Sequence, residues 1–71
     1  MLTEVLYIGD RLRQLRKRSL MTQEQLAERS DVAVSTVIRI ERNQVEPHGS
    51  TIRKLAEALG VDPHELVKPE E

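Results

Sequence analysis

Apolar residues recur every three or four positions along most of this chain, which is the spacing of one face of an α-helix. The first stripe predicts a helix that ends near Arg18, and it contains Val5, Ile8, Leu12 and Leu15. A second stripe, between Ser50 and Gly60, contains Ile52, Leu55, Ala56 and Leu59. Each of these helices is expected to bury its apolar face and to leave its charged residues in solvent.

A further helix is predicted from its first turn. Thr22, followed three residues later by Gln25, is typical of a capping box, in which side chains bond two backbone N–H groups at a helix start. We expect this helix over about 23–30, because Ser30 and Asp31 interrupt the apolar pattern. Asp tolerates the left-handed backbone of a tight turn, so a turn is expected at Asp31.

Two predictions compete for the stretch from Val32 to Ile40. It is rich in β-branched residues, which favour a strand. A lone strand would have no partner elsewhere in the chain, whereas Val37 and Ile40 are spaced to face the core from a helix. We therefore predict a helix over about 34–42, followed by Asn43 in a left-handed conformation and by a loop.

Two more helix starts complete the pattern. Ser50 is predicted as the N-cap of the fourth helix. A short fifth helix is expected after Asp62 as N-cap, with Pro63 at its first position and Glu65 at its third. The expected fold class is therefore all-α, a compact five-helix bundle.

A chain of 71 residues holds one domain,. We expect residues 1–7 to extend the first helix, residues 8–68 to form the domain and residues 69–71 to form a tail. The core must be aliphatic, because the chain contains no Cys, Trp or Phe and a single aromatic residue, Tyr7. The expected core residues are Leu12, Leu15, Met21, Leu26, Val37, Ile40, Ile52, Leu55 and Leu59.

Several classes of protein are disfavoured by the sequence. No apolar run approaches the roughly 18 residues of a membrane span, and residues 1–20 lack a secretory signal, so a cytoplasmic protein is expected. His48 and His64 have no metal-ligand spacing and the chain has no Cys, so neither a metal nor another cofactor is expected. No catalytic motif can be assembled, so we expect neither an enzyme nor a small-molecule ligand.

Charge is nearly balanced overall but unevenly distributed. Lys and Arg number 11 against 12 Asp and Glu, which argues against indiscriminate binding of polyanions,. Residues 11–18 nevertheless contain five cations and no acid, whereas residues 45–71 contain three cations and six acids. A charge run alone is usually a solvated helix face. Because residues 11–18 precede the two helices predicted over about 23–30 and 34–42, we interpret their positive charge as a functional face.

The two helices over about 23–30 and 34–42, joined by a short turn, form a predicted helix-turn-helix. In this motif the second helix can lie in the major groove of DNA. Leu26 is expected in the core, and the small Ala27 is expected where the two helices approach closely. The order of apolar and small residues therefore fits the motif.

The chain resembles the phage repressor and Cro-type (Xre-like) helix-turn-helix regulators over about residues 8–67. The matching segments are IGDRLRQLRKR, TQEQLAERSDV, STVIRIER and TIRKLAEALGVDPHELV. The resemblance implies a phage-repressor DNA-binding domain that binds double-stranded operator DNA. It also implies a homodimer on a palindrome, and repression or activation of transcription.

The resemblance further implies roles for individual residues. Base readout is implied for Val34, Ser35, Ile38 and Arg39, and phosphate contact for Gln23, Arg42 and Gln44. A structural salt bridge between the first and third helices is implied for Arg16 and Glu41. The chemistry suits these roles, because Arg pairs with guanine and apolar groups pack on thymine methyls. Alternatively, Ser35 caps its own helix, and Val34 and Ile38 are covered by the following loop or by a partner subunit.

Four departures from the family pattern lie at helix ends and turns. Glycine is common in the family where this chain has Leu20, Asp31 and Asn43, and a left-handed backbone would be strained at Leu20. Ala33 stands where Ser or Thr commonly caps the recognition helix, and loss of such a cap costs about 1 kcal/mol.

A second hypothesis is a protein-interaction or antitoxin-like module on the same fold, with a protein as its chief partner. The slightly acidic isoelectric point favours it. For a homodimer, the candidate interfaces are the fifth helix, with Leu66 and Val67, or the N-terminal extension 1–7. The sequence does not choose between these two faces.

Overall fold

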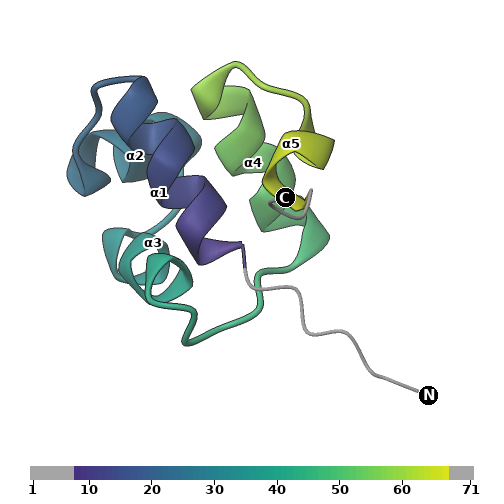
Figure 1. The fold of residues 1–71 in the computed structure, drawn as a ribbon. Coiled ribbons are helices and arrows are strands. Elements are labelled where there is room, and N and C mark those ends of the chain that lie inside the picture. The colour runs from purple at the N-terminus through teal and green to yellow at the C-terminus, as the bar shows by residue number, and fades with distance from the viewer. Residues whose placement is uncertain (1–7, 68–71) are drawn as a thin grey trace.

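The computed structural model describes residues 8–67 of the chain. These residues fold into five helices joined by short loops. Their bounds are α1 Gly9–Arg18, α2 Gln23–Ser30, α3 Val34–Glu41, α4 Gly49–Leu59 and α5 Pro63–Val67. In Figure 1, α2 and α3 lie to the left, α4 and α5 lie to the right, and α1 runs between them. Residues 8–67 contain no strand, so the predicted all-α five-helix fold is confirmed.

Some predictions fall outside this range. Val5 of the first apolar stripe, the N-terminal extension 1–7 and the tail 69–71 lie outside the described residues. Within the range, α1 begins at Gly9. The other members of the stripe, Ile8, Leu12 and Leu15, are all buried.

Local hydrogen bonds define the start and the end of α2. The Thr22 hydroxyl accepts a hydrogen bond from the Gln25 backbone N–H at 3.0 Å. The Gln25 side-chain oxygen in turn accepts one from the Thr22 backbone N–H at 2.9 Å. Asp31 follows α2 with a φ of 59°, in the left-handed region. The capping box and the turn therefore form as the sequence indicated.

The β-branched stretch folds as a helix, α3, and not as a strand. Val37 and Ile40 are 0% and 1% exposed, so one side of α3 is fully buried. Burial of this apolar side outweighs the weak intrinsic preference of β-branched residues for strands. α3 ends at Glu41, and Asn43 follows with a φ of 59°.

The predicted N-cap of α4 is wrong. α4 begins at Gly49, and His48, not Ser50, is the N-cap residue. The first hydrogen bond of this helix runs from the Ile52 N–H to the His48 carbonyl at 3.0 Å, so Ser50 already lies inside the first turn. An extended backbone at His48 starts the helix without a side-chain cap.

At α5, the structure supports one predicted cap residue and reassigns the other. Asp62 accepts a hydrogen bond from the His64 backbone N–H at 2.9 Å, and this bond lowers the pKa of Asp62 from its ordinary value. The Glu65 carboxylate pairs with Arg11 of α1 at 2.9 Å. Arg11 also donates to the Glu65 backbone carbonyl at 2.9 Å. Glu65 therefore ties α5 to α1.

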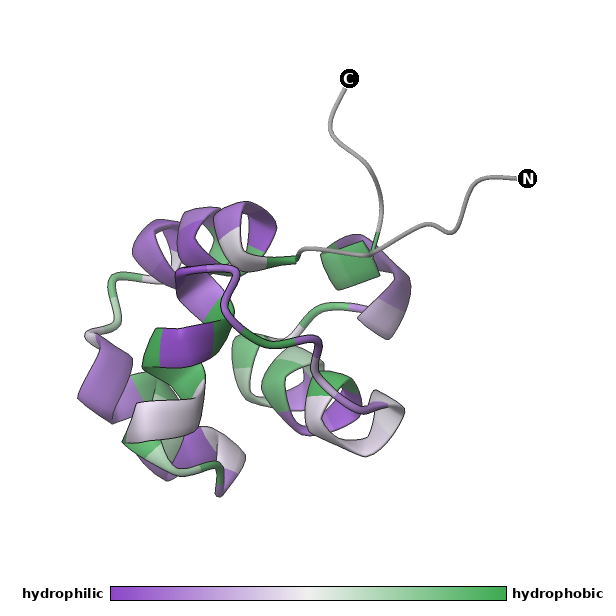
Figure 2. Ribbon diagram, turned by 90° about the horizontal axis from the view of Figure 1, so that it is seen from below, coloured by the Kyte–Doolittle hydropathy of each residue, from purple (hydrophilic) through white to green (hydrophobic). Residues whose placement is uncertain are grey.

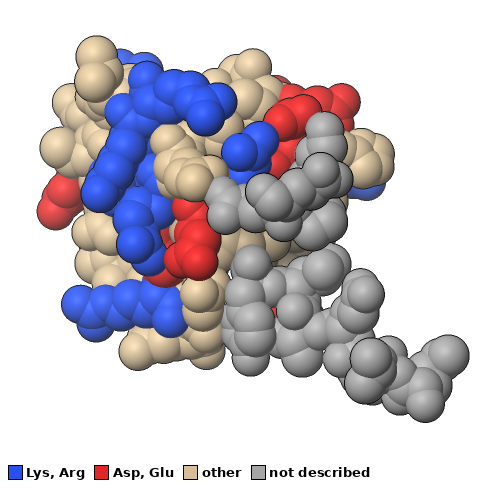
Figure 3. Space-filling model, viewed as in Figure 1, with Lys and Arg blue, Asp and Glu red and all other residues tan. Residues whose placement is uncertain are grey.

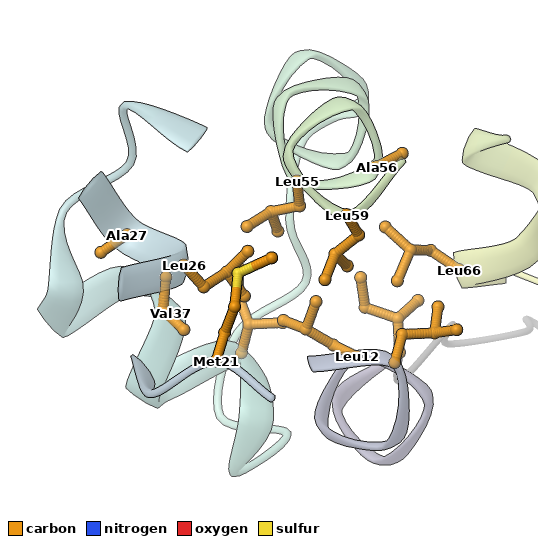
Figure 4. Close-up of a cluster of buried hydrophobic side chains, with 12 residues drawn as sticks. Leu12, Met21, Leu26, Ala27, Val37, Leu55, Ala56, Leu59 and Leu66 are labelled. Carbon is orange, nitrogen blue, oxygen red and sulfur yellow. The ribbon is translucent and has the colours of Figure 1, made fainter. Parts of the chain in front are cut away.

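One aliphatic cluster joins all five helices, and its side chains point toward one another in Figure 4. Its members are Ile8, Leu12, Leu15, Met21, Leu26, Ala27, Val37, Ile40, Leu55, Ala56, Leu59 and Leu66. Every predicted core residue belongs to it except Ile52, which is partly buried at its edge. Around each helix, hydrophobic and hydrophilic stretches alternate, as expected for helices with one buried side (Figure 2),.

The start of α1 lies directly against the end of α3. The Gly9 backbone N–H donates a hydrogen bond to the Asn43 side-chain oxygen at 3.0 Å. A Cβ atom on Gly9 would collide with this oxygen and with the backbone carbonyls of Ile40 and Glu41. One turn along α1, Arg13 donates to the Glu41 carbonyl at 3.0 Å. α1 therefore supplies a partner for the Glu41 carbonyl, which has no partner within its own helix,.

A buried ion pair connects α1, α2 and α3. Arg16 donates two hydrogen bonds to the Glu41 carboxylate, at 2.6 and 2.9 Å. Arg16 also donates to the Met21 carbonyl at 2.9 Å, and the Gln23 side-chain amide donates to Glu41 at 3.1 Å. Hydrogen bonding to Glu41 raises the pKa of Arg16 above its ordinary value, although burial opposes the shift. The guanidinium stays charged, and the pair holds the end of α3 at a set position.

Loss of this pair should destabilise the domain strongly. We expect Glu41→Ala to lower the free energy of unfolding by about 3 kcal/mol, because the Arg16 charge is then left without its partner. The Glu41 side chain is only 3% exposed, so solvent screens the interaction weakly. Urea unfolding followed by circular dichroism measures the change. A double variant, Arg16→Met with Glu41→Leu, should recover most of the loss, and a fully stable Glu41→Ala variant would contradict this role.

The contact at Gly9 is also testable. We expect Gly9→Ala to lower the free energy of unfolding by about 1–3 kcal/mol, because the new methyl group must push α1 away from α3. Gly49→Ala is the matched control, because a Cβ atom at Gly49 meets no atom within 4 Å. That variant should keep or gain stability, by up to about 1 kcal/mol. Thermal unfolding compares the two, and equal shifts for both variants would contradict the prediction.

Candidate nucleic-acid interface

One side of α3 faces solvent, and it carries the four residues predicted to read bases. These are Val34, Ser35, Ile38 and Arg39, whose spacing places them on one side of a helix,. Ser35 and Arg39 are exposed, Val34 is 38% exposed and Ile38 is partly buried. The opposite side of α3 packs into the core. α3 therefore presents a row of mixed polar and apolar side chains on a rigid support.

The loop after α3 lies along a flank of the helix. It borders a pocket of about 320 Å³, to which Thr36 and Arg39 contribute from α3 and Val45 and His48 from the loop side. Val34 and Ile38 do not line this pocket. The N-cap of α3 is Ala33, whose side chain makes no capping hydrogen bond, in keeping with the departure seen in the sequence.

The three residues predicted to contact phosphate lie near the two ends of the motif. Gln23 is the first residue of α2, and its side-chain amide is bonded to Glu41. Arg42 is exposed immediately after α3. Gln44 is also exposed, and its backbone N–H donates to the Arg39 carbonyl at 2.9 Å. Glu41 thus connects the start of α2 to the segment that carries Arg42 and Gln44.

Lys and Arg side chains concentrate on one part of the surface. In Figure 3 they gather over α1 in the left half of the view, with some acidic side chains among them, and another group of acidic side chains lies at the upper right, toward α4 and α5. α1 carries three cations in its last turn, Arg16, Lys17 and Arg18. α1, which packs against the end of α3, therefore carries five of the 11 Lys and Arg residues of the chain.

The Arg16–Glu41 pair follows the expectation from the family resemblance, but sequence reasoning missed two further contacts from α1 to the end of α3. Gly9 and Arg13 both bond groups at the end of α3, and neither was assigned a role. Asn43 was expected only as a left-handed residue, yet its side chain also accepts the Gly9 N–H. A glycine at the start of a helix is the one local signal for such a close approach.

Residues 8–67, the described part of the chain, lack two kinds of feature. In this range no group of three or more His, Cys, Asp or Glu side chains is arranged to hold a metal ion. None of the helices there is both long and apolar enough to cross a membrane.

Comparison with known sequences shows clear relatives. A family model described as helix-turn-helix matches residues 12–66. The immunity repressor protein of Bacillus phage phi105 is 36% identical over 63 residues, which are 89% of this chain and 44% of the repressor. An uncharacterised HTH-type transcriptional regulator, y4dJ, of Sinorhizobium fredii is 36% identical over 87% of this chain and 80% of its own length. The chain thus spans less than half of the phage repressor but most of the bacterial regulator.

Solved structures show the same arrangement of helices. The restriction-modification controller protein C.AhdI from Aeromonas hydrophila superposes with a TM-score of 0.82 at 40% identity, over 87% of this chain and 94% of that one. The P22 c2 repressor, solved in complex with a synthetic operator, gives a TM-score of 0.80 at 29% identity, over 96% of this chain and 100% of that one. On the family match and these relatives, the chain belongs to the helix-turn-helix family of the phage-repressor (Xre-like) type.

Proposed function

We propose that this protein is a sequence-specific DNA-binding transcriptional regulator that inserts α3 into the major groove of a palindromic operator. The observation that carries the proposal is the two-sided character of α3. Val37 and Ile40 anchor one side of the helix in the core, while Arg39 and its neighbours are presented on the other. A helix of this kind fits the width of the B-DNA major groove. The P22 c2 repressor, which matches the whole fold, was solved with an operator bound.

The exposed side chains of α3 have the chemistry to distinguish bases. Arg39 can donate two hydrogen bonds to the O6 and N7 atoms of guanine, which is worth about 1–3 kcal/mol of discrimination. Val34 and Ile38 can pack on the methyl group of thymine. Ser35 can bond a base edge or a phosphate. A site containing both a guanine and thymines in each half is therefore expected.

Contacts to the DNA backbone would set the register of α3. Gln23, Arg42 and Gln44 are proposed to contact phosphates on either side of the groove. Because the side-chain amide of Gln23 is bonded to Glu41, its phosphate contact is assigned to the backbone N–H groups and positive end of α2,. Arg42 supplies a full charge at the end of α3.

A homodimer is proposed because one recognition helix reads too few base pairs to be specific in a genome. Two residues were predicted for an α5 interface. The prediction for Leu66 is wrong, because Leu66 is 1% exposed and belongs to the core of the monomer. Val67 is only partly buried and stays a candidate for that interface. The alternative interface, residues 1–7, lies outside the described residues. We place the protein in the cytoplasm, where such a dimer has access to DNA.

Selection of bound duplexes from a random DNA pool tests the proposed function. The expected product is a palindrome whose half-sites are centred about 10 base pairs apart, since a two-fold dimer presents its recognition helices one DNA turn apart. Sedimentation of the complex gives its stoichiometry. If no duplex binds even at low salt, the proposal fails, and the protein-interaction or antitoxin-like alternative takes its place.

Arg39→Ala tests the assignment of the base-reading residue. With the selected duplex, we expect about tenfold or greater weakening, and the preference should relax at one base pair in each half-site. Arg29→Ala is a suitable control, because Arg29 is exposed near the end of α2 and has no proposed DNA contact. Repeated selection with both variants measures the change. An Arg39→Ala variant with unaltered preference at every position would remove Arg39 from base readout.

A further inference from the structure

Leu20, in the turn between α1 and α2, has an unusual combination of properties. Its φ is 60°, in the left-handed region, and its side chain is 89% exposed. Its backbone N–H donates to the Lys17 carbonyl at 3.0 Å, and the Met21 N–H donates to the Arg16 carbonyl at 3.1 Å. These two bonds are those of a Schellman motif, with Leu20 at the position that glycine usually occupies.

Leucine brings no benefit to the folded monomer at this position. A left-handed backbone is unfavourable for a residue with a Cβ atom, and glycine would adopt it without strain. The exposed side chain buries almost no apolar surface in return. A large apolar side chain held at such a site is therefore available for a contact outside the monomer.

The surroundings of Leu20 favour a polyanion as that contact. Lys17 and Arg18 precede it and are both exposed. No acidic residue occurs from Arg11 to Arg18. A second protein surface that buried Leu20 would have to accommodate these charges as well, whereas a nucleic acid backbone offers phosphates beside apolar sugar faces.

The position of the turn brings this corner beside the proposed DNA-binding surface. The Arg16 guanidinium bonds both the carbonyl of Met21, the residue after Leu20, and the Glu41 carboxylate at the end of α3. Gln23, at the start of α2, bonds the same carboxylate. Leu20 therefore lies three residues before Gln23 in the chain, and Arg16 connects the residue after Leu20 to the end of α3.

We propose that the α1–α2 corner, formed by Lys17, Arg18 and Leu20, is a further contact to the DNA backbone. Lys17 and Arg18 each neutralise a phosphate, and Leu20 packs on the deoxyribose between them. The inference rests on the proposed function, because it takes DNA as the ligand. It adds a contact with no base specificity, which strengthens binding to every sequence and leaves the preference of α3 unchanged.

The salt dependence of DNA binding tests the two cations. Each phosphate contact contributes about 0.9 to the slope of log K against log salt concentration. We expect the Lys17→Gln, Arg18→Gln double variant of the full chain to reduce the slope magnitude by about 1.8 with the selected duplex. The matched control is Arg53→Gln with Lys54→Gln, which removes two exposed cations from α4 and should leave the slope unchanged.

Two substitutions of Leu20 separate DNA contact from a structural role. Leu20→Gly and Leu20→Asn both suit a left-handed backbone, and both remove the apolar side chain. We expect Leu20→Gly to raise the Tm by about 5 °C, because the strain is relieved. Both variants should nevertheless bind the duplex about threefold to tenfold more weakly, with no change in sequence preference. A purely structural residue would not give a more stable protein that binds DNA less well.

The outcomes are distinguishable from those of the proposed function. If wild-type protein binds no duplex, the proposed function itself fails. If it binds and the double variant keeps the wild-type slope, the corner is not a phosphate contact and the inference is overturned. If the slope falls but both Leu20 variants bind as wild type does, the contact is confined to the two cations and the role of Leu20 is overturned.

Discussion

The placement of α3 depends on the ion pair between Arg16 and Glu41. A buried charge pair is tolerated only when its remaining hydrogen-bonding groups also have partners. Here Gln23 donates to the carboxylate, and the Met21 carbonyl accepts from the guanidinium. Because these four groups come from α1, the turn after it, the start of α2 and the end of α3, the network orients the helix-turn-helix as one unit.

The contacts around this pair leave the outer side of α3 available. Two hydrogen bonds lie at the carboxyl-terminal end of α3. Gly9 donates one to the Asn43 side chain, and Arg13 donates the other to the Glu41 carbonyl. The aliphatic core covers the remaining inner surface. A helix held in this way can present side chains such as Arg39 with little loss of backbone conformational freedom on binding, which is the physical advantage of building a recognition surface on a rigid element.

Local signals predicted the helices well, because capping and periodicity act over a few residues. The capping box at Thr22 and the turn at Asp31 form as expected. Errors arose where a tertiary contact or the backbone overrode a local preference. Ser50 resembles an N-cap, yet the backbone turns one residue earlier. Leu66 looked available for an interface, yet the bundle buries it. Glu65 fits a capping pattern, yet it pairs with α1.

By itself, the sequence determined the number and kind of elements and the composition of the core. It also placed Val37 and Arg39 on different sides of one helix, because helical periodicity makes side-chain direction a property of spacing. Only the tertiary structure decided that Gly9 permits α1 to touch the end of α3, and that Gln23 completes the buried charge pair. Such contacts join residues far apart in the chain, and their geometry exists only after the helices have packed.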